Sequence, residues 1–349
     1  MPGPASGVYE AWVTSESADQ VSLVRFGPAG AEVVHTQPVG MMPVEIDGPH
    51  GVAVSPDGSF IYVTTGHGVP NGYLWKIDTR TMQVLGRTPL GRFPATVSVT
   101  PDGQFGFISN FNLHGDPIPS SISKVHLGTM AEVARTETCV MPHGSRINPQ
   151  GTRHYSVCMM DQLLVEIDVG TGAVRRFFSL APGHEGPVEG AAGAPAEHEP
   201  AADADICSPT WAEPSADGSS VFVTCNRRGE VVEVDVASWA VERRIETGES
   251  PYNLATTPDG RYLLISLRNR TDPALEVYDV ASGRQVGRVP ATTTLVHGIA
   301  VTPDSRYAFA TAEGVGAEPG KVDVVDLREL RRVGSVEVGQ QATGVAVVP

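Results

Sequence analysis

The sequence has little cysteine, little positive charge and no long apolar runs. It contains four cysteines in 349 residues, and its 25 Lys and Arg against 40 Asp and Glu give a formal net charge of −15. Such a surface repels phosphate backbones and anionic lipid, so neither a nucleic-acid nor a membrane partner is expected. No apolar run approaches the roughly 20 residues that span a bilayer. Four cysteines in a chain of this size do not indicate a disulfide framework. Because the N-terminus also lacks a basic and then apolar signal region, a cytoplasmic location is expected.

Glycine and proline are plentiful, with 38 and 28 copies, and many of them stand in a repeated turn of the Pro-Asp-Gly type. The proline-equivalent positions of this turn are Pro56, Pro101, Pro149, Ala216, Pro258, Pro303 and Pro349. Their spacings are 45, 48, 67, 42, 45 and 46 residues. A period near 45 that is built from short strands and tight turns is typical of propeller blades.

Each repeat predicts four strands, which in the first copy cover residues 51–55, 60–64, 73–78 and 83–87. Residues 8–15, 20–26 and 31–37 predict three strands without a first one, and residues 342–348 supply it. The sequence therefore predicts an all-β, seven-bladed propeller with four antiparallel strands per blade. Residues 1–349 form a single domain, and strands from both chain ends close the last blade.

Two local motifs carry a resemblance to a known family. Tyr-Val-Thr-Thr at residues 62–65 and Ser-Pro-Asp-Gly at residues 55–58 resemble the bacterial YVTN-type propellers of the YncE kind. That family is related by fold to the propellers of nitrous oxide reductase and cytochrome cd1. The resemblance implies the propeller fold over the whole chain and says little about activity.

One spacing is too long because of an insertion at residues 181–206, between blades three and four. This segment is rich in Ala, Gly, Pro and Glu and has no apolar period. It is interpreted either as a solvated loop or as a mobile lid.

The residues that open the first strands should meet around the top mouth of the central channel. Around the ring they are His50, Ala95, His143, Thr210, Tyr252, His297 and Thr343. Seven-fold division separates the three histidines by about 103°, 154° and 103°. Neutral imidazoles are common ligands of transition metals, so His50, His143 and His297 predict a metal site, with copper as the expected ion and iron as the alternative. A histidine-lined pocket for an organic ligand and purely structural histidines remain as other interpretations.

Three positions further along the first strands, the ring contains five small residues, Arg146 and Glu213. These two charges lie on adjacent blades and predict an ion pair below the histidines. The pair either plugs the channel or leaves Arg146 to bind an anionic substrate. Glu313 closes the second strand of blade six and is expected to orient substrate or water.

Cysteine and histidine at the ends of other second strands are further candidates. Cys158 and Cys225 share one repeat position and are interpreted as small core residues, as thiolate ligands or as a redox pair. Cys158 is the expected fourth metal ligand, should one be used. His67 and His114 lie in polar loops and are expected to be solvated.

The combined prediction is a copper- or iron-dependent oxidoreductase that acts on a small-molecule substrate at the top mouth. Nitrous oxide reductase and thiocyanate dehydrogenase, which look similar in fold, place copper on histidines at a propeller mouth. One alternative is a lactonase-like hydrolase that uses Glu313, Glu213 and Arg146. The other is a non-catalytic scaffold that binds a ligand or a protein. The oligomeric state stays open.

Overall fold

A computed structural model of the chain describes residues 4, 7–41, 45–67, 71–188 and 206–349. The repeated turn joins two strands through local hydrogen bonds. In the first repeat, Asp57 Oδ1 accepts hydrogen bonds from the Ser55 hydroxyl at 2.6 Å and from the Ser59 N–H at 3.0 Å. Gly58 has a φ of 73°, a conformation that favours glycine. The same contact joins Thr100 to Asp102, Ser215 to Asp217, Thr257 to Asp259 and Thr302 to Asp304.

The strands form seven sheets, each with at least four strands in sequential antiparallel order. Blade one contains β4 (Pro49–Val54), β5 (Phe60–Thr65), β6 (Tyr73–Asp78) and β7 (Val84–Pro89). Blade two contains β8 (Pro94–Val99), β9 (Phe105–Asn110), β10 (Pro119–His126) and β11 (Ala131–Val140). Blade three contains β12 (Pro142–Ile147), β13 (Arg153–Cys158), β14 (Leu163–Asp168), β15 (Val174–Ser179) and β16 (Gly186–Val188). Blade four contains β17 (Pro209–Pro214), β18 (Ser220–Cys225), β19 (Glu230–Asp235) and β20 (Ala240–Glu246). Blade five contains β21 (Pro251–Thr256), β22 (Tyr262–Leu267), β23 (Ala274–Asp279) and β24 (Arg284–Pro290). Blade six contains β25 (Val296–Val301), β26 (Tyr307–Ala312), β27 (Gly320–Asp326) and β28 (Arg331–Val338).

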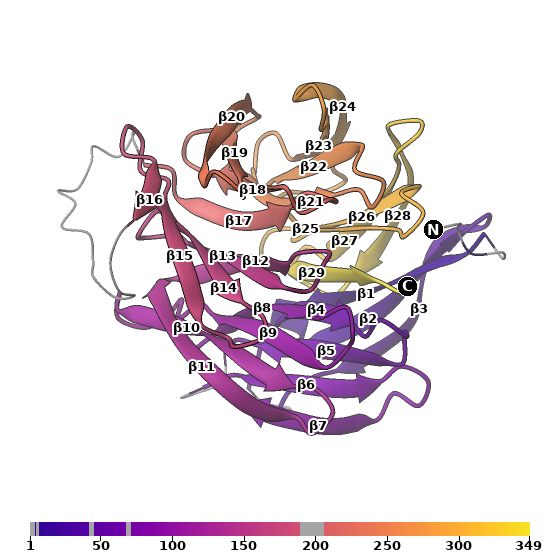
Figure 1. Cartoon of the computed structure of the whole chain (residues 1–349). Helices are drawn as coiled ribbons and strands as arrows, with labels where there is room; N and C mark the ends of the chain where they lie inside the picture. Colours follow the sequence, from indigo (N-terminus) through magenta and orange to yellow (C-terminus); the bar gives the residue numbers. More distant parts are fainter. Residues whose placement is uncertain (1–3, 5–6, 42–44, 68–70, 189–205) are drawn as a thin grey trace.

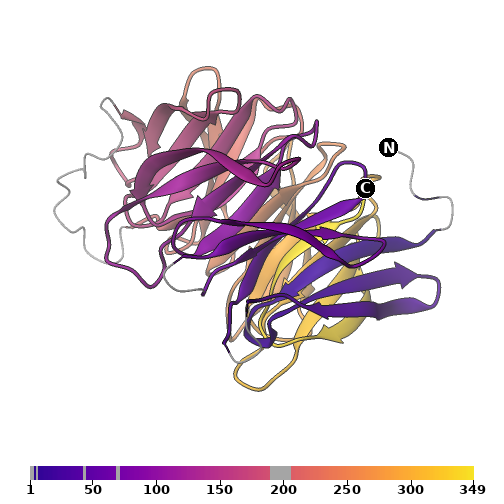
Figure 2. The ribbon, with the colours of Figure 1, turned by 90° about the horizontal axis from the view of Figure 1, so that it is seen from below.

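Blade seven is built from both ends of the chain. It contains β29 (Ala342–Val347), β1 (Tyr9–Ser15), β2 (Gln20–Gly27) and β3 (Gly30–Pro38), in that order across the sheet. Figures 1 and 2 show the yellow β29 beside the indigo β1, and Trp12 lies opposite Ala346 in their register. Each first strand contacts the first strands of both neighbouring blades, so the ring closes on itself. The predicted seven-bladed propeller and its shared last blade are thus confirmed.

Apolar layers between neighbouring blades form the core. One cluster joins Trp12 and Val21 of blade seven to Ile61 and Trp75 of blade one. Because each layer is shared by two sheets, no blade can bury its apolar faces alone. The only helical segment in the described part of the chain is a 3₁₀ turn, η1 (Glu16–Ala18). None of the helical segments described is long and apolar enough to cross a membrane.

The insertion predicted as a loop at residues 181–206 contains some regular structure. Residues Gly186–Val188 form β16, a fifth strand that pairs with β15, and Glu185 forms an ion pair with Arg244 of blade four. The prediction of a loop or lid for residues 189–205 falls outside the described residues.

All four cysteines are paired, which corrects the expectation drawn from their small number. Cys139 bonds to Cys158 and links the outer strand of blade two to the second strand of blade three. Cys207 bonds to Cys225 and connects the approach to blade four with its second strand. The packing of blade two against blade three brings Cys139 and Cys158 together, whereas Cys207 meets Cys225 within blade four, through the pairing of β17 with β18. Cys158 and Cys225, which share a repeat position, therefore do not pair with each other.

Candidate functional site

Six of the seven residues that open the first strands, all except Thr210, are positioned by a hydroxyl group of the preceding blade. The Thr14 hydroxyl donates to the carbonyl of His50 at 2.7 Å, and Ser266 donates to that of His297 at 3.2 Å. The carbonyl of His143 accepts from Thr96 at 3.1 Å. Thr14 and Ser266 hold the second-to-last position of a second strand, as do Thr64, Thr224 and Thr311, which make the same kind of contact. The backbone that carries the three histidines is therefore fixed across the blade interfaces.

The glycine after each of the three histidines serves this close packing. A Cβ at Gly51 would lie 2.3 Å from the carbonyl oxygen of Ala95, and one at Gly144 would lie 2.4 Å from that of Thr210. A side chain at either position would therefore force two blades apart.

The three histidine rings converge at the top mouth, as their repeat position predicts. The ring centroids of His50 and His297 are 5.2 Å apart, and those of His50 and His143 are 6.2 Å apart. Tyr252, at the same ring position in blade five, lies beside two of them. Its hydroxyl is 3.3 Å from His143 Nε2, and its ring is 4.8 Å from that of His297.

The Nδ1 atoms of two histidines are held from outside the channel. His50 Nδ1 is 2.7 Å from Glu16 Oε2, and His143 Nδ1 is 2.9 Å from the carbonyl oxygen of Thr210. The opposite nitrogen of His50, Nε2, is buried without a protein partner, and so is Nδ1 of His297. The site thus holds imidazole nitrogens that are both oriented and unused.

Burial keeps the rings of His143 and His297 neutral. It lowers the pKa of His143 to about 3, and it also holds the pKa of His297 well below its ordinary value, with help from the charges of His50 and Arg268. Neutral imidazole is the form that binds metals or accepts a hydrogen bond.

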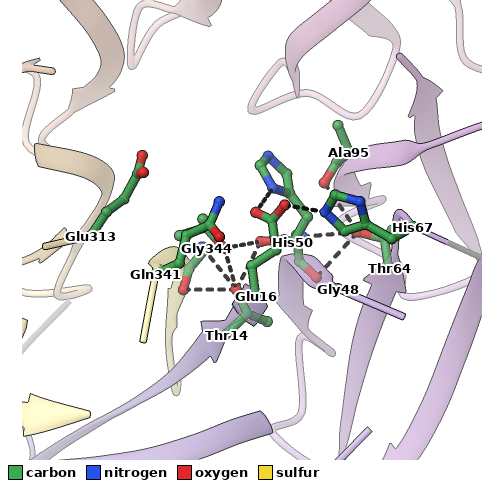
Figure 3. A network of polar contacts seen from close by, with 12 residues as sticks. Thr14, Glu16, Gly48, His50, Thr64, His67, Ala95, Glu313, Gln341 and Gly344 are labelled. Carbon is green, nitrogen blue, oxygen red and sulfur yellow. Dashed lines mark hydrogen bonds and ion pairs between the residues drawn. The ribbon is translucent and has the colours of Figure 1, made fainter. Parts of the chain in front are cut away.

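Glu16 is a site residue that the sequence interpretation missed. Its second oxygen, Oε1, lies 2.6 Å from His67 Nε2, so one carboxylate bridges His50 and His67 (Figure 3). Burial alone would raise the pKa of Glu16, but the charges and hydrogen bonds of His50 and His67 outweigh it and lower that pKa to about 2. His67 is therefore half-buried and ordered by Glu16, which corrects the expectation of a solvated loop residue. His114 contacts His67 at 3.2 Å at the exposed end of this chain of contacts.

A signal for Glu16 was present in the repeat. Glu16 directly follows β1, as Glu313 directly follows β26, so the two carboxylates hold one repeat position in adjacent blades. Glu313 itself binds Arg268 through two contacts of 2.6 and 3.1 Å, and the Arg268 guanidinium lies 5.3 Å from the ring centroid of Tyr252. Burial raises the pKa of Glu313, and Arg268 opposes that effect. The carboxylate expected to orient substrate is thus already occupied by an arginine.

Below the histidines, Arg146 and Glu213 face each other across neighbouring blades, as expected. Arg146 Nε lies 3.4 Å from Glu213 Oε2, and its guanidinium lies over the Trp211 ring at 4.7 Å. The other carboxylate oxygen, Oε1, accepts from the N–H and hydroxyl of Thr256 at 3.1 and 3.2 Å.

Cys158 cannot serve as the extra metal ligand that the sequence suggested, because its sulfur is bonded to Cys139 and offers no thiolate. In the arrangement observed, no group of three or more His, Cys, Asp or Glu side chains within the described ranges is placed to hold a metal ion. A metal bound by the three histidines would therefore require a small rearrangement of the rings.

Ring closure and blade order define the chain as a seven-bladed β-propeller. Residues 201–345 match the model of the YNCE-like β-propeller family, which confirms the resemblance seen in the motifs. Two solved structures are similar over nearly the whole length. One is hydrazine synthase from Kuenenia stuttgartiensis, which is 21% identical with a TM-score of 0.67, over 89% of this chain and 94% of that one. The other is a functionally unknown protein from Desulfotomaculum acetoxidans, which is 14% identical with a TM-score of 0.71, over 97% and 98%. At these identities the likeness shows the fold alone. None of the curated proteins compared with the chain matches it.

Proposed function

We propose that the chain is a metal-dependent oxidoreductase that acts on a small molecule at the top mouth, with His50, His143 and His297 as ligands. The observation that carries the proposal is the buried, unpartnered Nε2 of His50, whose Nδ1 is held by Glu16. Histidines that bind metals commonly donate their other N–H to a carboxylate or a backbone carbonyl. His143 has the corresponding carbonyl contact.

The separations of His50 from the other two histidine rings support a shared metal site. Imidazole nitrogens bind transition metals at about 2.0–2.1 Å, which places neighbouring ring centroids about 5 Å apart. His50 and His297 have this separation, at 5.2 Å, whereas His50 and His143 are 6.2 Å apart. The His143 ring would have to approach by about 1 Å. That motion would exchange its contact with the Tyr252 hydroxyl for the ligand bond.

Copper is the favoured ion and iron the alternative, because nitrogen ligands bind divalent copper more tightly than its first-row neighbours. When bound, such an ion would supply one-electron chemistry and polarise a substrate atom. The residues of the chain would hold the site in place. Glu16 would fix the tautomer and direction of the His50 ring, and the Glu313–Arg268 pair would offer charged hydrogen-bond partners at the rim.

The test is the metal content of protein incubated with copper, iron or zinc and then freed of excess ion. We expect about one copper per chain in the wild type and a sharp loss in each of His50→Ala, His143→Ala and His297→Ala. His126→Ala is the matched control, because that histidine bonds Thr129 in an exposed turn. Circular dichroism checks that every variant remains folded. Copper content that stays equal in all variants would refute the ligand assignment, and a wild type without metal would favour a non-catalytic scaffold.

We also propose that the protein folds in an oxidising compartment, in place of the cytoplasmic location expected from the sequence. Two buried disulfides support this, since such bonds persist where thiols are not kept reduced. Thiol labelling of protein that is taken directly from its native cells and denatured without reductant tests the proposal. Four unreactive cysteines are expected, and four labelled cysteines would contradict it.

A further inference from the structure

A small cavity lies on the channel axis directly below the histidine ring. It has a volume of about 30 Å³, and its walls include His50, His297, Asn253, Trp211 and Arg146. A water molecule needs about 10–15 Å³ by this measure, so the cavity admits a group of two or three heavy atoms.

Several polar atoms of the residues that line this cavity have no protein partner. They are Trp211 Nε1, Asn253 Oδ1, His50 Nε2 and His297 Nδ1. Trp211 and Asn253 are 5% and 2% exposed, so bulk water does not satisfy them. Buried polar atoms that remain unpaired carry a free-energy cost of desolvation, and a bound polar group would relieve it. The indole N–H can only donate, whereas the Asn253 amide has a donor and an acceptor end that exchange by a half-turn.

Arg146 is the charged group at the floor of the cavity. Its Nη1 donates to the carbonyl of Ser145 at 3.0 Å, and its Nε makes the long contact to Glu213. Within the described residues these are its only polar contacts, although a guanidinium has five N–H donors. Stacking on Trp211 fixes the plane of the guanidinium. Part of the Arg146 fork is therefore oriented and unused.

A wider vestibule of about 310 Å³ lies on the other side of Arg146, which lines both spaces. Its walls include Ala53, Ser98, Ala255, Ala300 and Ala346, the small residues three positions along from the histidine ring. None of the three histidines lines this space, so it offers access to Arg146 that does not pass them.

We propose that the channel binds a small planar monoanion of the carboxylate type, which enters through the vestibule and is held by Arg146 and the indole N–H of Trp211. A guanidinium fork matches two oxygens of a planar anion, and these charge-assisted hydrogen bonds are among the stronger ones in proteins. Glu213 opposes the anion by its own charge and competes for Arg146. The site goes beyond the proposed metal centre, because the groups proposed to hold the anion, Arg146 and Trp211, are not among the three metal ligands.

The test uses ¹³C-formate with chelator-treated, metal-free protein, so that its outcome is separate from that of the metal proposal. Line broadening of the formate signal gives the affinity, and formamide serves as the neutral isostere. We expect saturable binding of one formate per chain and no binding of formamide at the same concentration. Equal binding of formate and formamide would overturn the proposal, as would no binding of formate.

Three variants locate the site. Glu213→Gln should bind formate several times more tightly than wild type, because the competing carboxylate is gone. The double variant Arg146→Gln/Glu213→Gln leaves no unpaired charge and should bind at least tenfold more weakly than wild type. Trp211→Phe keeps a ring beneath Arg146 and should weaken binding by a smaller factor. Unchanged affinity in the first two variants would exclude Arg146 as the anion ligand.

A second pair of variants, one in the vestibule and one control, tests the route by which the anion enters. Ala300→Phe should fill the vestibule and abolish or strongly slow formate binding, while the metal content of copper-loaded protein stays unchanged. Ala281→Phe, in an exposed turn, is the control and should behave as wild type. Normal formate binding by a folded Ala300→Phe protein would overturn the proposed route.

Discussion

Two levels of one channel satisfy their polar groups in opposite ways. At the top mouth, His50 and His143 bond outward, to Glu16 and to the Thr210 carbonyl, which leaves His50 Nε2 without a protein partner and His143 Nε2 beside the Tyr252 hydroxyl. Three positions below, Arg146 and Glu213 turn toward each other at 3.4 Å, and in the described part of the chain the guanidinium otherwise contacts the Ser145 carbonyl and the Trp211 ring. Hydrogen bonds from outside the channel orient the histidine rings for a ligand. In contrast, the ion pair of Arg146 and Glu213 within the channel competes with a ligand for the same charged groups.

Removal of the last eight residues, 342–349, should have the largest effect, because it abolishes both levels. β29 supplies the first strand of blade seven, and Thr343 bonds the carbonyl of His50 at 3.0 Å. Without β29 the unpaired edge of β1 is exposed and the ring is open. We expect aggregation or loss of the cooperative thermal transition, measured by circular dichroism and light scattering. A monomer with unchanged melting would contradict closure by the C-terminal strand.

Glu16→Gln should break the outer support of the top mouth alone. The difference between the ordinary pKa of 4.5 and the value of about 2 in the folded protein corresponds to about 3 kcal/mol of stability. Because the folded pKa is the lower one, this stability is present above about pH 4.5 and is lost as the pH falls towards 2. Urea unfolding at pH 7 should show the loss in the variant, and the difference from wild type should shrink below pH 4.5. A constant difference across that range would refute the assignment.

Replacing Cys139 and Cys158 by serine should distinguish the stability of the propeller from metal binding at the candidate site. Closing a loop of this length stabilises a protein by about 3 kcal/mol in the chain-entropy model. We expect a loss of that size in urea unfolding and an unchanged metal content, because Cys158 is not a ligand. Reduced metal content in a folded double variant would indicate that Cys158 takes part in metal binding after all.

Glu213→Gln should have the smallest effect on stability. Its contact with Arg146 is long, and the guanidinium is 29% exposed, so we expect a change of less than about 1 kcal/mol at pH 7. Burial raises the pKa of Glu213, so its contribution has the opposite sign to that of Glu16. It favours the folded state at low pH and is lost as the pH rises through the folded pKa. Urea unfolding as a function of pH should show this slope in wild type and not in the variant.

Most of the fold and part of the candidate site could be predicted from the sequence repeat. The positions of the repeated Pro-Asp-Gly turn predicted the number of blades, the shared last blade, the histidine ring and the Arg146–Glu213 pair, because equivalent positions of a repeat adopt the same geometry. The disulfides could not be read in this way, since Cys139 and Cys158 lie in different blades. Glu16 was missed because its blade is split between the chain ends, although its repeat position matches that of Glu313. Pairing between particular side chains, such as Glu313 with Arg268, depends on rotamers that the period does not specify.

The hydroxyl groups between the blades have a consequence for engineering. Thr14 and Ser266 hold the backbone of His50 and His297 through carbonyl oxygens, which every residue type possesses. The side chains of His50 and His297 can therefore be exchanged without loss of the contact that positions their backbone, whereas Thr210 and Thr343 also hold the carbonyls of Tyr252 and His50 through their own hydroxyl groups. The mouth is in effect a seven-place template in which Ala95, Thr210, Tyr252 and Thr343 occupy the places without histidine. A designer could vary the number and angular order of donor groups there while leaving the blades unaltered.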